Sequence, residues 1–213
     1  MAEIYASHWV GKGRVQRACS RDRQTAAIEG MLQLHDEEAT ELLLIRHAET
    51  PCSHHGTDAD APLSVEGISQ ADLLADRLSD FWVEAVYCSP ELRARWTAQI
   101  VADALHRPVQ ELPGLREIEG ANQAEDASIP VTTDLFRQQR RWDTLHGFES
   151  GHAFRRRVLE TLEGVQKAHA ARRSVVITHA SVINAYLSHV MDIPFFFFNE
   201  TENSEIYTVR SLE

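Results

Sequence analysis

The chain has 213 residues, of which 43% are hydrophobic and 25% charged, proportions close to those of an average soluble globular protein. This length suits one domain with a single sizeable core. A formal net charge of -11 argues against a nucleic-acid partner, and no apolar run reaches the roughly 20 residues that cross a bilayer, so we also expect no membrane partner.

Residues 1–40 differ in pattern from the rest of the chain. They show no strand signal, and only residues 24–38 have a helical spacing of apolar side chains, through Ala27, Met31 and Leu34. We therefore predict an N-terminal appendage over residues 1–40, partly helical or flexible, followed by a folded domain over residues 41–213.

The first predicted strand covers residues 42–45, an apolar run that ends abruptly in Arg46-His47. A buried parallel strand has this pattern when it delivers polar side chains to one edge of a sheet. Residues 51–62 are predicted to form a loop. Ser64 then suits the N-cap of a helix whose apolar face follows an i, i+3, i+4 progression through Ile68, Ala71, Leu74, Ala75 and Leu78.

A second strand is predicted over residues 83–88, which are apolar and rich in β-branched side chains. Ser89 and Pro90 would supply the cap and the first-turn proline of a helix that runs to about Leu105. Small and polar residues predict a loop over residues 118–133, and residues 133–145 suit a short basic helix.

The last predicted strand covers residues 174–178 and ends in His179. A helix over residues 151–171 precedes it, and another helix follows it. Strands that alternate with helices in this way predict an α/β fold, a three-layer sandwich with a mainly parallel central sheet flanked by helices on both faces.

Polar residues follow three of these strands, and in open α/β sheets ligands bind beyond the carboxyl ends of the strands. Arg46-His47, the segment from Ser89 to Arg93, and His179 would converge there. A neutral imidazole can attack phosphorus, and a guanidinium binds phosphate oxygens in a bidentate manner. These residue types therefore suit phosphoryl transfer through a histidine, which also needs a carboxylic acid to protonate the leaving oxygen.

Residues 42–50, Leu-Leu-Leu-Ile-Arg-His-Ala-Glu-Thr, resemble the signature strand and loop of the histidine phosphatase superfamily, the group that includes phosphoglycerate mutases. Four further segments resemble motifs of that family in the same order, namely residues 62–71, 88–98, 115–118 and 175–183. The resemblance implies that residues 41–213 form a histidine phosphatase-like catalytic domain without a metal or another cofactor.

The resemblance also implies roles for individual residues. His47 would be the nucleophile, Glu117 the proton donor, and the phosphate pocket would contain Arg46, Arg93 and His179. Thr50, Ser53 and Ala180 would complete the substrate-binding set. Ser53 stands where mutases of the family carry asparagine, Ala180-Ser181 replace the usual glycine pair, and Glu119 competes with Glu117 for the acid role.

The sequence thus predicts a phosphatase that hydrolyses a small phosphorylated substrate through a phosphohistidine. One alternative is a phosphoglycerate mutase-type phosphotransferase, and another is a catalytically weak protein that binds a phosphorylated ligand.

Three widely spaced cysteines, Cys19, Cys52 and Cys88, fit neither a disulfide framework nor a zinc ribbon, so we expect a cytoplasmic protein. The phenylalanines at 195–198 suit a core contact or the interface of a homodimer.

Overall fold

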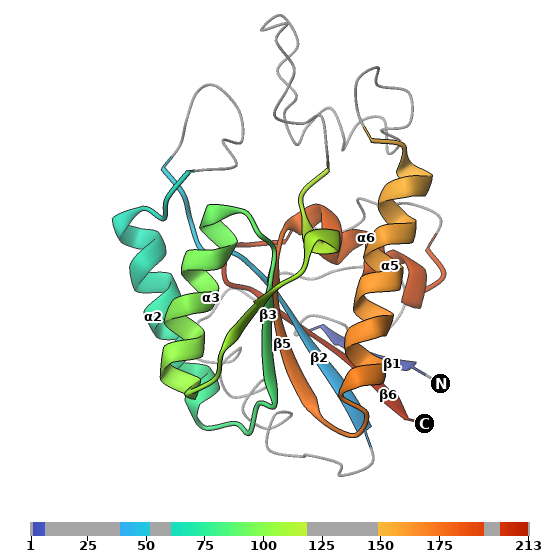
Figure 1. Ribbon diagram of the computed structural model, residues 1–213, viewed down its shortest axis with the longest axis horizontal. Coiled ribbons are helices and arrows are strands. Elements are labelled where there is room, and N and C mark those ends of the chain that lie inside the picture. Colours follow the sequence, from blue (N-terminus) through green and yellow to red (C-terminus); the bar gives the residue numbers. More distant parts are fainter. Residues whose placement is uncertain (1, 7–38, 52–60, 119–148, 194–200, 213) are drawn as a thin grey trace, which may run out of the picture.

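The computed structural model describes residues 2–6, 39–51, 61–118, 149–193 and 201–212. In these residues a six-stranded sheet of order β1-β6-β2-β5-β3-β4 lies between two layers of helices (Figure 1). The predicted α/β three-layer sandwich is therefore confirmed.

The centre of the sheet is parallel. β2 (Ala39–Arg46) pairs with β5 (Arg173–Thr178), β5 pairs with β3 (Ala85–Cys88), and β3 pairs with β4 (Val109–Glu111). Arg46 lies opposite Thr178, and Cys88 lies opposite Ile177, so three strands end at the same level. Because the strands end at the same level, the residues that follow them lie close together.

One side of the sheet was not predicted from the sequence. β6 (Ile206–Leu212) pairs antiparallel with β2 and also with β1 (Ala2–Ala6), which forms one edge of the sheet. The expectation that residues 1–40 contain no strand is thus wrong, because β1 is only five residues long and forms by pairing with a strand some 200 positions away. The division of the chain at residue 40 stays a prediction.

Helix α2 (Val65–Ser79) begins as predicted, since the Ser64 hydroxyl accepts a hydrogen bond of 2.9 Å from the backbone N–H of Gly67. The predicted burial of Ile68 is wrong, because this side chain is 40% exposed. Gly67 faces inward instead, where its backbone lies directly against that of Glu49.

Helix α3 (Leu92–Leu105) starts later than predicted. Its N-cap is Glu91, so Ser89 and Pro90 precede the helix instead of opening it. The remaining helices are α5 (Gly151–Ala168), α6 (Ala180–Val190) and the short 3-10 turn η1 (Pro113–Leu115). None of the helices in the described ranges is long and apolar enough to span a membrane.

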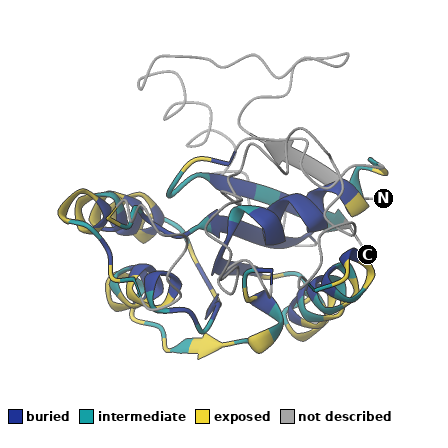
Figure 2. Ribbon diagram, turned by 90° about the horizontal axis from the view of Figure 1, so that it is seen from above, coloured by how far each residue is buried: buried dark blue, intermediate teal, exposed yellow. Residues whose placement is uncertain are grey.

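Alternate side chains of the central strands build two cores. Leu42 and Leu44 of β2 pack on the side of α5 and α6, whereas Leu43 and Ile45 pack on the side of α2 and α3. Burial is accordingly concentrated in the sheet and on the inward faces of the helices, while exposed residues lie on the outward faces (Figure 2). Five predictions fall wholly or mostly on residues outside the described ranges: the helix at 24–38, the loop at 51–62, the loop at 118–133, the helix at 133–145 and the contact made by 195–198.

Candidate active site

The carboxyl ends of β2, β3 and β5 are tied together by the backbone. The N–H of His47 donates to the carbonyl of Thr178 at 2.9 Å, and the N–H of Ser89 donates to the carbonyl of Ile177 at 3.0 Å. The Thr178 hydroxyl donates to the carbonyl of Leu115 at 2.9 Å, which attaches the segment carrying Glu117 to the same place. All the polar segments singled out in the sequence therefore meet at this edge of the sheet.

Arg93 lies between the two histidines. Its Nε atom is 3.2 Å from His47 Nε2, and its Nη2 atom is 3.3 Å from His179 Nδ1. The two imidazole rings have their centroids 5.3 Å apart and are inclined at 60°. The structure thus brings these three residues into direct contact, although they are separated by 46 and 86 positions along the chain.

The backbone fixes the tautomer of His47. Its Nδ1 atom is 2.8 Å from the carbonyl oxygen of Ala48, which can only accept, so Nδ1 carries the proton and Nε2 presents a lone pair. Burial, together with the charge of Arg93, lowers the pKa of His47 to about 3. The imidazole is therefore neutral near pH 7, as a nucleophile must be.

His179 is completely buried and is held at both ring nitrogens. The guanidinium of Arg93 can only donate, so Nδ1 accepts from it, and Nε2 donates to the hydroxyl of Ser89 at 2.8 Å. Burial and the nearby charge of Arg93 hold the pKa of His179 well below its ordinary value. Ser89, predicted as a helix cap, thus contacts a site residue instead.

Arg46 occupies the end of β2 and is half-buried. Its Nη1 atom donates to the carbonyl of Thr201 at 2.6 Å. Its charge is close enough to contribute to the lowered pKa of both His47 and His179. Two guanidinium groups therefore act on the same two imidazoles.

Glu117 borders this cluster. One carboxylate oxygen accepts a hydrogen bond from the hydroxyl of Ser181 and another, of 3.0 Å, from the N–H of Ile118. The other oxygen lies 4.0 Å from His179 Nδ1. A carboxylic acid is thus present within reach of the histidines, as protonation of a leaving group requires.

Two charged residues of the site were missed in the sequence. Glu91 is buried, forms an ion pair with Arg93, and accepts a hydrogen bond of 3.0 Å from the backbone N–H of Glu117. An acidic residue just before a helix usually caps it, so the sequence carried no sign of this position.

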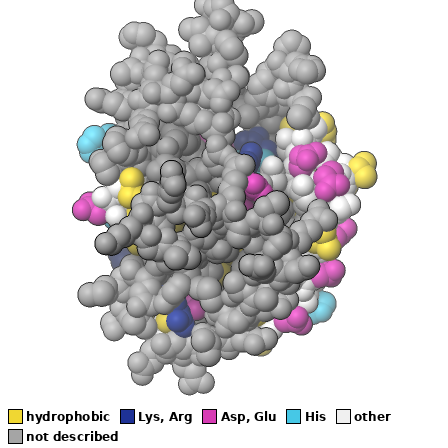
Figure 3. Space-filling view, turned by 180° about the vertical axis from the view of Figure 1, so that it is seen from behind, with side chains coloured by type: hydrophobic (Ala, Val, Ile, Leu, Met, Phe, Trp, Pro, Cys, Tyr) yellow, Lys and Arg dark blue, Asp and Glu magenta, His cyan; other side chains and the backbone are white. Residues whose placement is uncertain are grey.

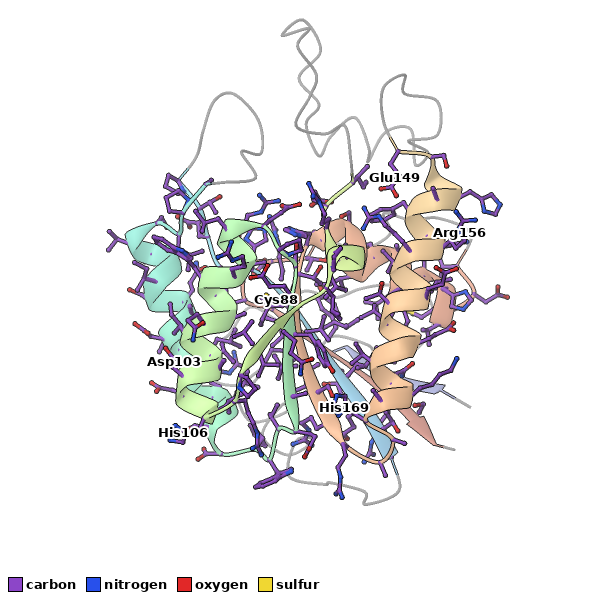
Figure 4. The ribbon with its side chains drawn as sticks, in the orientation of Figure 1. Cys88, Asp103, His106, Glu149, Arg156 and His169 are labelled. Atoms are coloured by element: carbon purple, nitrogen blue, oxygen red, sulfur yellow. The ribbon has the colours of Figure 1, made fainter. Side chains whose placement is uncertain are left out.

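Arg157 of α5 is the other missed residue. Its guanidinium donates to the carbonyls of Gly114, Arg116 and Glu117 at 2.8–3.0 Å and forms two bonds with the carboxylate of Glu149. It thereby fixes the backbone on which Glu117 is mounted. Glu149 lies at the upper end of α5, at the same edge of the molecule as the strand ends (Figure 4).

The other residues considered in the sequence lie around this cluster or outside the described residues. Thr50 is half-buried in the loop after His47, and Ala180 is the first residue of α6, directly after His179. Ser53 and Glu119 lie outside the described residues. The thiol of Cys88 is buried beneath the site, and burial raises its pKa to about 12, so it is not a nucleophile at neutral pH (Figure 4).

The sequence profile of the histidine phosphatase superfamily (branch 1) matches residues 42–211, which include every residue of this cluster. The chain belongs to the histidine phosphatase superfamily. The resemblance seen in the sequence motifs is thereby confirmed.

Individual members of the superfamily show how far the likeness extends. The chain is 39% identical over 80 residues to the adenosylcobalamin/alpha-ribazole phosphatase of Escherichia coli, a stretch that covers 36% of this chain and 39% of that enzyme. The chain thus aligns with less than half the length of this curated relative.

Solved structures of the superfamily share the fold over most of the chain. A mycobacterial glucosyl-3-phosphoglycerate phosphatase matches with a TM-score of 0.67 at 19% identity, over 80% of this chain and 89% of its own. A phosphoglycerate mutase from Bacillus anthracis also matches with a TM-score of 0.67 at 19% identity, over 84% and 93%. Both likenesses concern the fold.

Proposed function

We propose that this protein hydrolyses a small phosphomonoester through a phosphohistidine at His47. The observation that carries the proposal is the state of the His47 imidazole: its Nδ1 proton is held by the Ala48 carbonyl, and its Nε2 lone pair faces the guanidinium of Arg93. A nucleophile and a phosphate-binding group are thus in contact. The name of the curated relative as a phosphatase supports hydrolysis as the reaction.

In the first step, Nε2 of His47 attacks phosphorus and the ester P–O bond breaks. The electron pair leaves with the alkoxide oxygen, which takes the proton of Glu117. Arg46, Arg93 and the buried His179 surround the phosphoryl group, and the two guanidinium groups offset its charge. Thr50, Ser53 and Ala180 remain proposed contacts of the substrate.

In the second step, water attacks the phosphoryl group while Glu117 accepts its proton. The P–N bond breaks, and its electron pair returns to Nε2, which restores the free enzyme. A mutase would instead return the phosphoryl group to another hydroxyl of the bound substrate. Release of inorganic phosphate is therefore the product that distinguishes the proposed reaction from isomerisation.

Replacement of the nucleophile tests this proposal. We expect His47→Ala to lower kcat on p-nitrophenyl phosphate by about a thousandfold or more, because no other described group replaces the attacking nitrogen. Rapid acid-free quenching with labelled substrate should trap a base-stable, acid-labile phosphoenzyme in the wild type and none in the variant.

A matched control is His152→Ala, because His152 is exposed on α5. Its activity should equal that of the wild type. Full activity of His47→Ala, or turnover of the wild type without a phosphoenzyme, would refute the proposal. Isomerisation of phosphoglycerate without phosphate release would assign the same site to a mutase.

A further inference from the structure

Glu91 brings a second carboxylate into the site. It is 6% exposed, its Oε2 atom forms an ion pair with Nη2 of Arg93, and the same oxygen is 3.5 Å from Nε2 of His179. Its Oε1 atom accepts the hydrogen bond from the N–H of Glu117. One side chain therefore contacts the phosphate-binding arginine, the second histidine and the segment that carries the acid.

Capping of a helix does not account for this position. Glu91 is the N-cap residue of α3, yet within the described residues its side chain makes no capping hydrogen bond to that helix. The carboxylate turns instead toward Arg93 and Glu117. Its interactions are thus those of a site residue.

Glu91 and a bound phosphoryl group would both interact with Arg93. A phosphate dianion bound to Arg93 would place like charges next to each other in a buried site, where they disfavour each other's ionised form. Arg93 cannot relieve this by losing charge, because a guanidinium stays protonated. The remaining response is uptake of a proton by the carboxylate.

We propose that Glu91 is a positioning residue that holds Arg93 and becomes protonated when a phosphoryl group binds there, so that anion binding takes up one proton from solvent. This inference rests on the proposed phosphatase site. It makes binding of the substrate, and of the phosphate product, weaker as the pH rises. The charge-neutral form of Glu91 still accepts the hydrogen bond from Glu117 and so keeps the acid in place.

The groups around Glu91 fit this behaviour. Among the described residues, the charged and titratable side chains that face it are Arg93 of α3, His179 between β5 and α6, and Arg116 and Glu117 after η1. Burial, partly offset by Arg93 and reinforced by Glu117, raises the pKa of Glu91 above its ordinary value. A bound dianion would raise this pKa further, which widens the range in which binding takes up a proton.

Sulfate is a suitable probe, because it remains a dianion throughout the experiment and cannot itself supply the pH dependence. Sulfate binding is measured by calorimetry from about pH 5 to 8 in buffers of different ionisation heat. Because the pKa of Glu91 is raised already before the anion binds, we expect the proton uptake of the wild type to approach one toward the upper part of this range, where the affinity falls by up to about tenfold per pH unit. Glu91→Gln, which keeps an oxygen for Glu117, should bind about tenfold more tightly near pH 7 and lose most of the proton uptake.

The control is Glu111→Gln, the same chemical change in a half-exposed residue that pairs with Arg95. It should behave like the wild type. If Glu91→Gln fails to fold, Glu91→Met provides a second uncharged side chain of similar length. Equal proton uptake in wild type and uncharged variant, no uptake in the wild type, or no sulfate binding by either protein would overturn the inference.

The sulfate experiment and the test of the proposed phosphatase activity can fail independently of each other. Sulfate binding requires no chemical step, so Glu91 can be tested even if no ester is hydrolysed. Conversely, a phosphoenzyme at His47 together with unchanged sulfate binding in Glu91→Gln would leave the phosphatase proposal intact and remove only the role of Glu91.

Discussion

His47 depends on one backbone contact for its proposed reactivity. The Ala48 carbonyl determines which ring nitrogen carries the proton, and burial keeps the ring neutral by lowering its pKa to about 3. Glu117 depends in the same way on a neighbouring side chain, because the hydroxyl of Ser181 donates to its carboxylate. Ser181 stands where the family pattern has glycine, so this contact is a feature of the present chain.

Removal of that hydroxyl should slow catalysis. The hydroxyl of Ser181 holds the Glu117 carboxylate in place, so Ser181→Ala should leave this group less well oriented toward the leaving oxygen. We expect kcat on an alkyl phosphate to fall by about fivefold, which corresponds to one hydrogen bond of about 1 kcal/mol. Ser188→Ala is the control in the same helix, since its hydroxyl donates to the Ala185 carbonyl, and it should leave kcat unchanged. An unchanged kcat in Ser181→Ala would show that the contact has no effect on catalysis.

The amino end of α2 positions the loop that follows His47. The N–H and the hydroxyl of Ser64 both donate to Glu49, at 3.0 and 2.9 Å, and the N–H of Glu49 donates to the side chain of Gln70 at 3.0 Å. This close docking requires a residue without a side chain at position 67, because a Cβ atom there would overlap the carbonyl oxygen of Glu49. The helix and the catalytic loop thus form one packed unit.

We therefore expect Gly67→Ala to lower the free energy of unfolding by about 1–3 kcal/mol, the usual cost of an added methyl group in a tightly packed place. Unfolding in urea measures this change. Gly164→Ala is the matched control in α5, where an added Cβ meets nothing within 4 Å. Alanine is the better helix former, so this variant should gain roughly 0.5–1 kcal/mol. Equal stability of the two variants would contradict the role of Gly67.

Ionisable side chains lie at both edges of the sheet, but those of the site lie at the upper edge (Figure 4). Figure 3 shows acidic side chains beside basic ones in both the upper and the lower half of the face seen from behind. His106 and His169 lie at the opposite, lower edge and so take no part in the site (Figure 4). Below the site, Glu41 of β2 joins its two neighbouring strands, through Arg173 of β5 at 2.6–2.7 Å and Arg210 of β6 at 3.0 Å.

Glu41 should therefore affect stability without affecting catalysis. Its carboxylate and the side chain of Arg173 are almost completely buried, so Glu41→Ala removes the carboxylate that accompanies a buried cation. We expect a loss of about 3–5 kcal/mol in the free energy of unfolding and an unchanged KM for the folded protein. Glu111→Gln, in an exposed pair, should cost no more than about 1 kcal/mol. A loss of similar size in both variants, or a changed KM in Glu41→Ala, would contradict this separation.

The sequence by itself determined the parts that depend on local pattern. Apolar runs predict β2, β3 and β5, and the polar residues that end them give Arg46, His47 and His179 as neighbours. The order of the motifs gives the superfamily. Ser64 predicts the start of α2, since a cap requires only a few adjacent residues.

Tertiary structure decided what depends on contacts between distant segments. β6 is a strand because it pairs with β2, and β1 is a strand because it pairs with β6. Ser89 does not cap α3, and its hydroxyl contacts His179 instead. The same holds for the charge pattern of the site. Glu91 stands two positions before an arginine, which is an ordinary pattern in a sequence. Only folding surrounds its carboxylate with a buried guanidinium, an imidazole and a second acid. In these surroundings the cost of burying charge determines which group carries the proton.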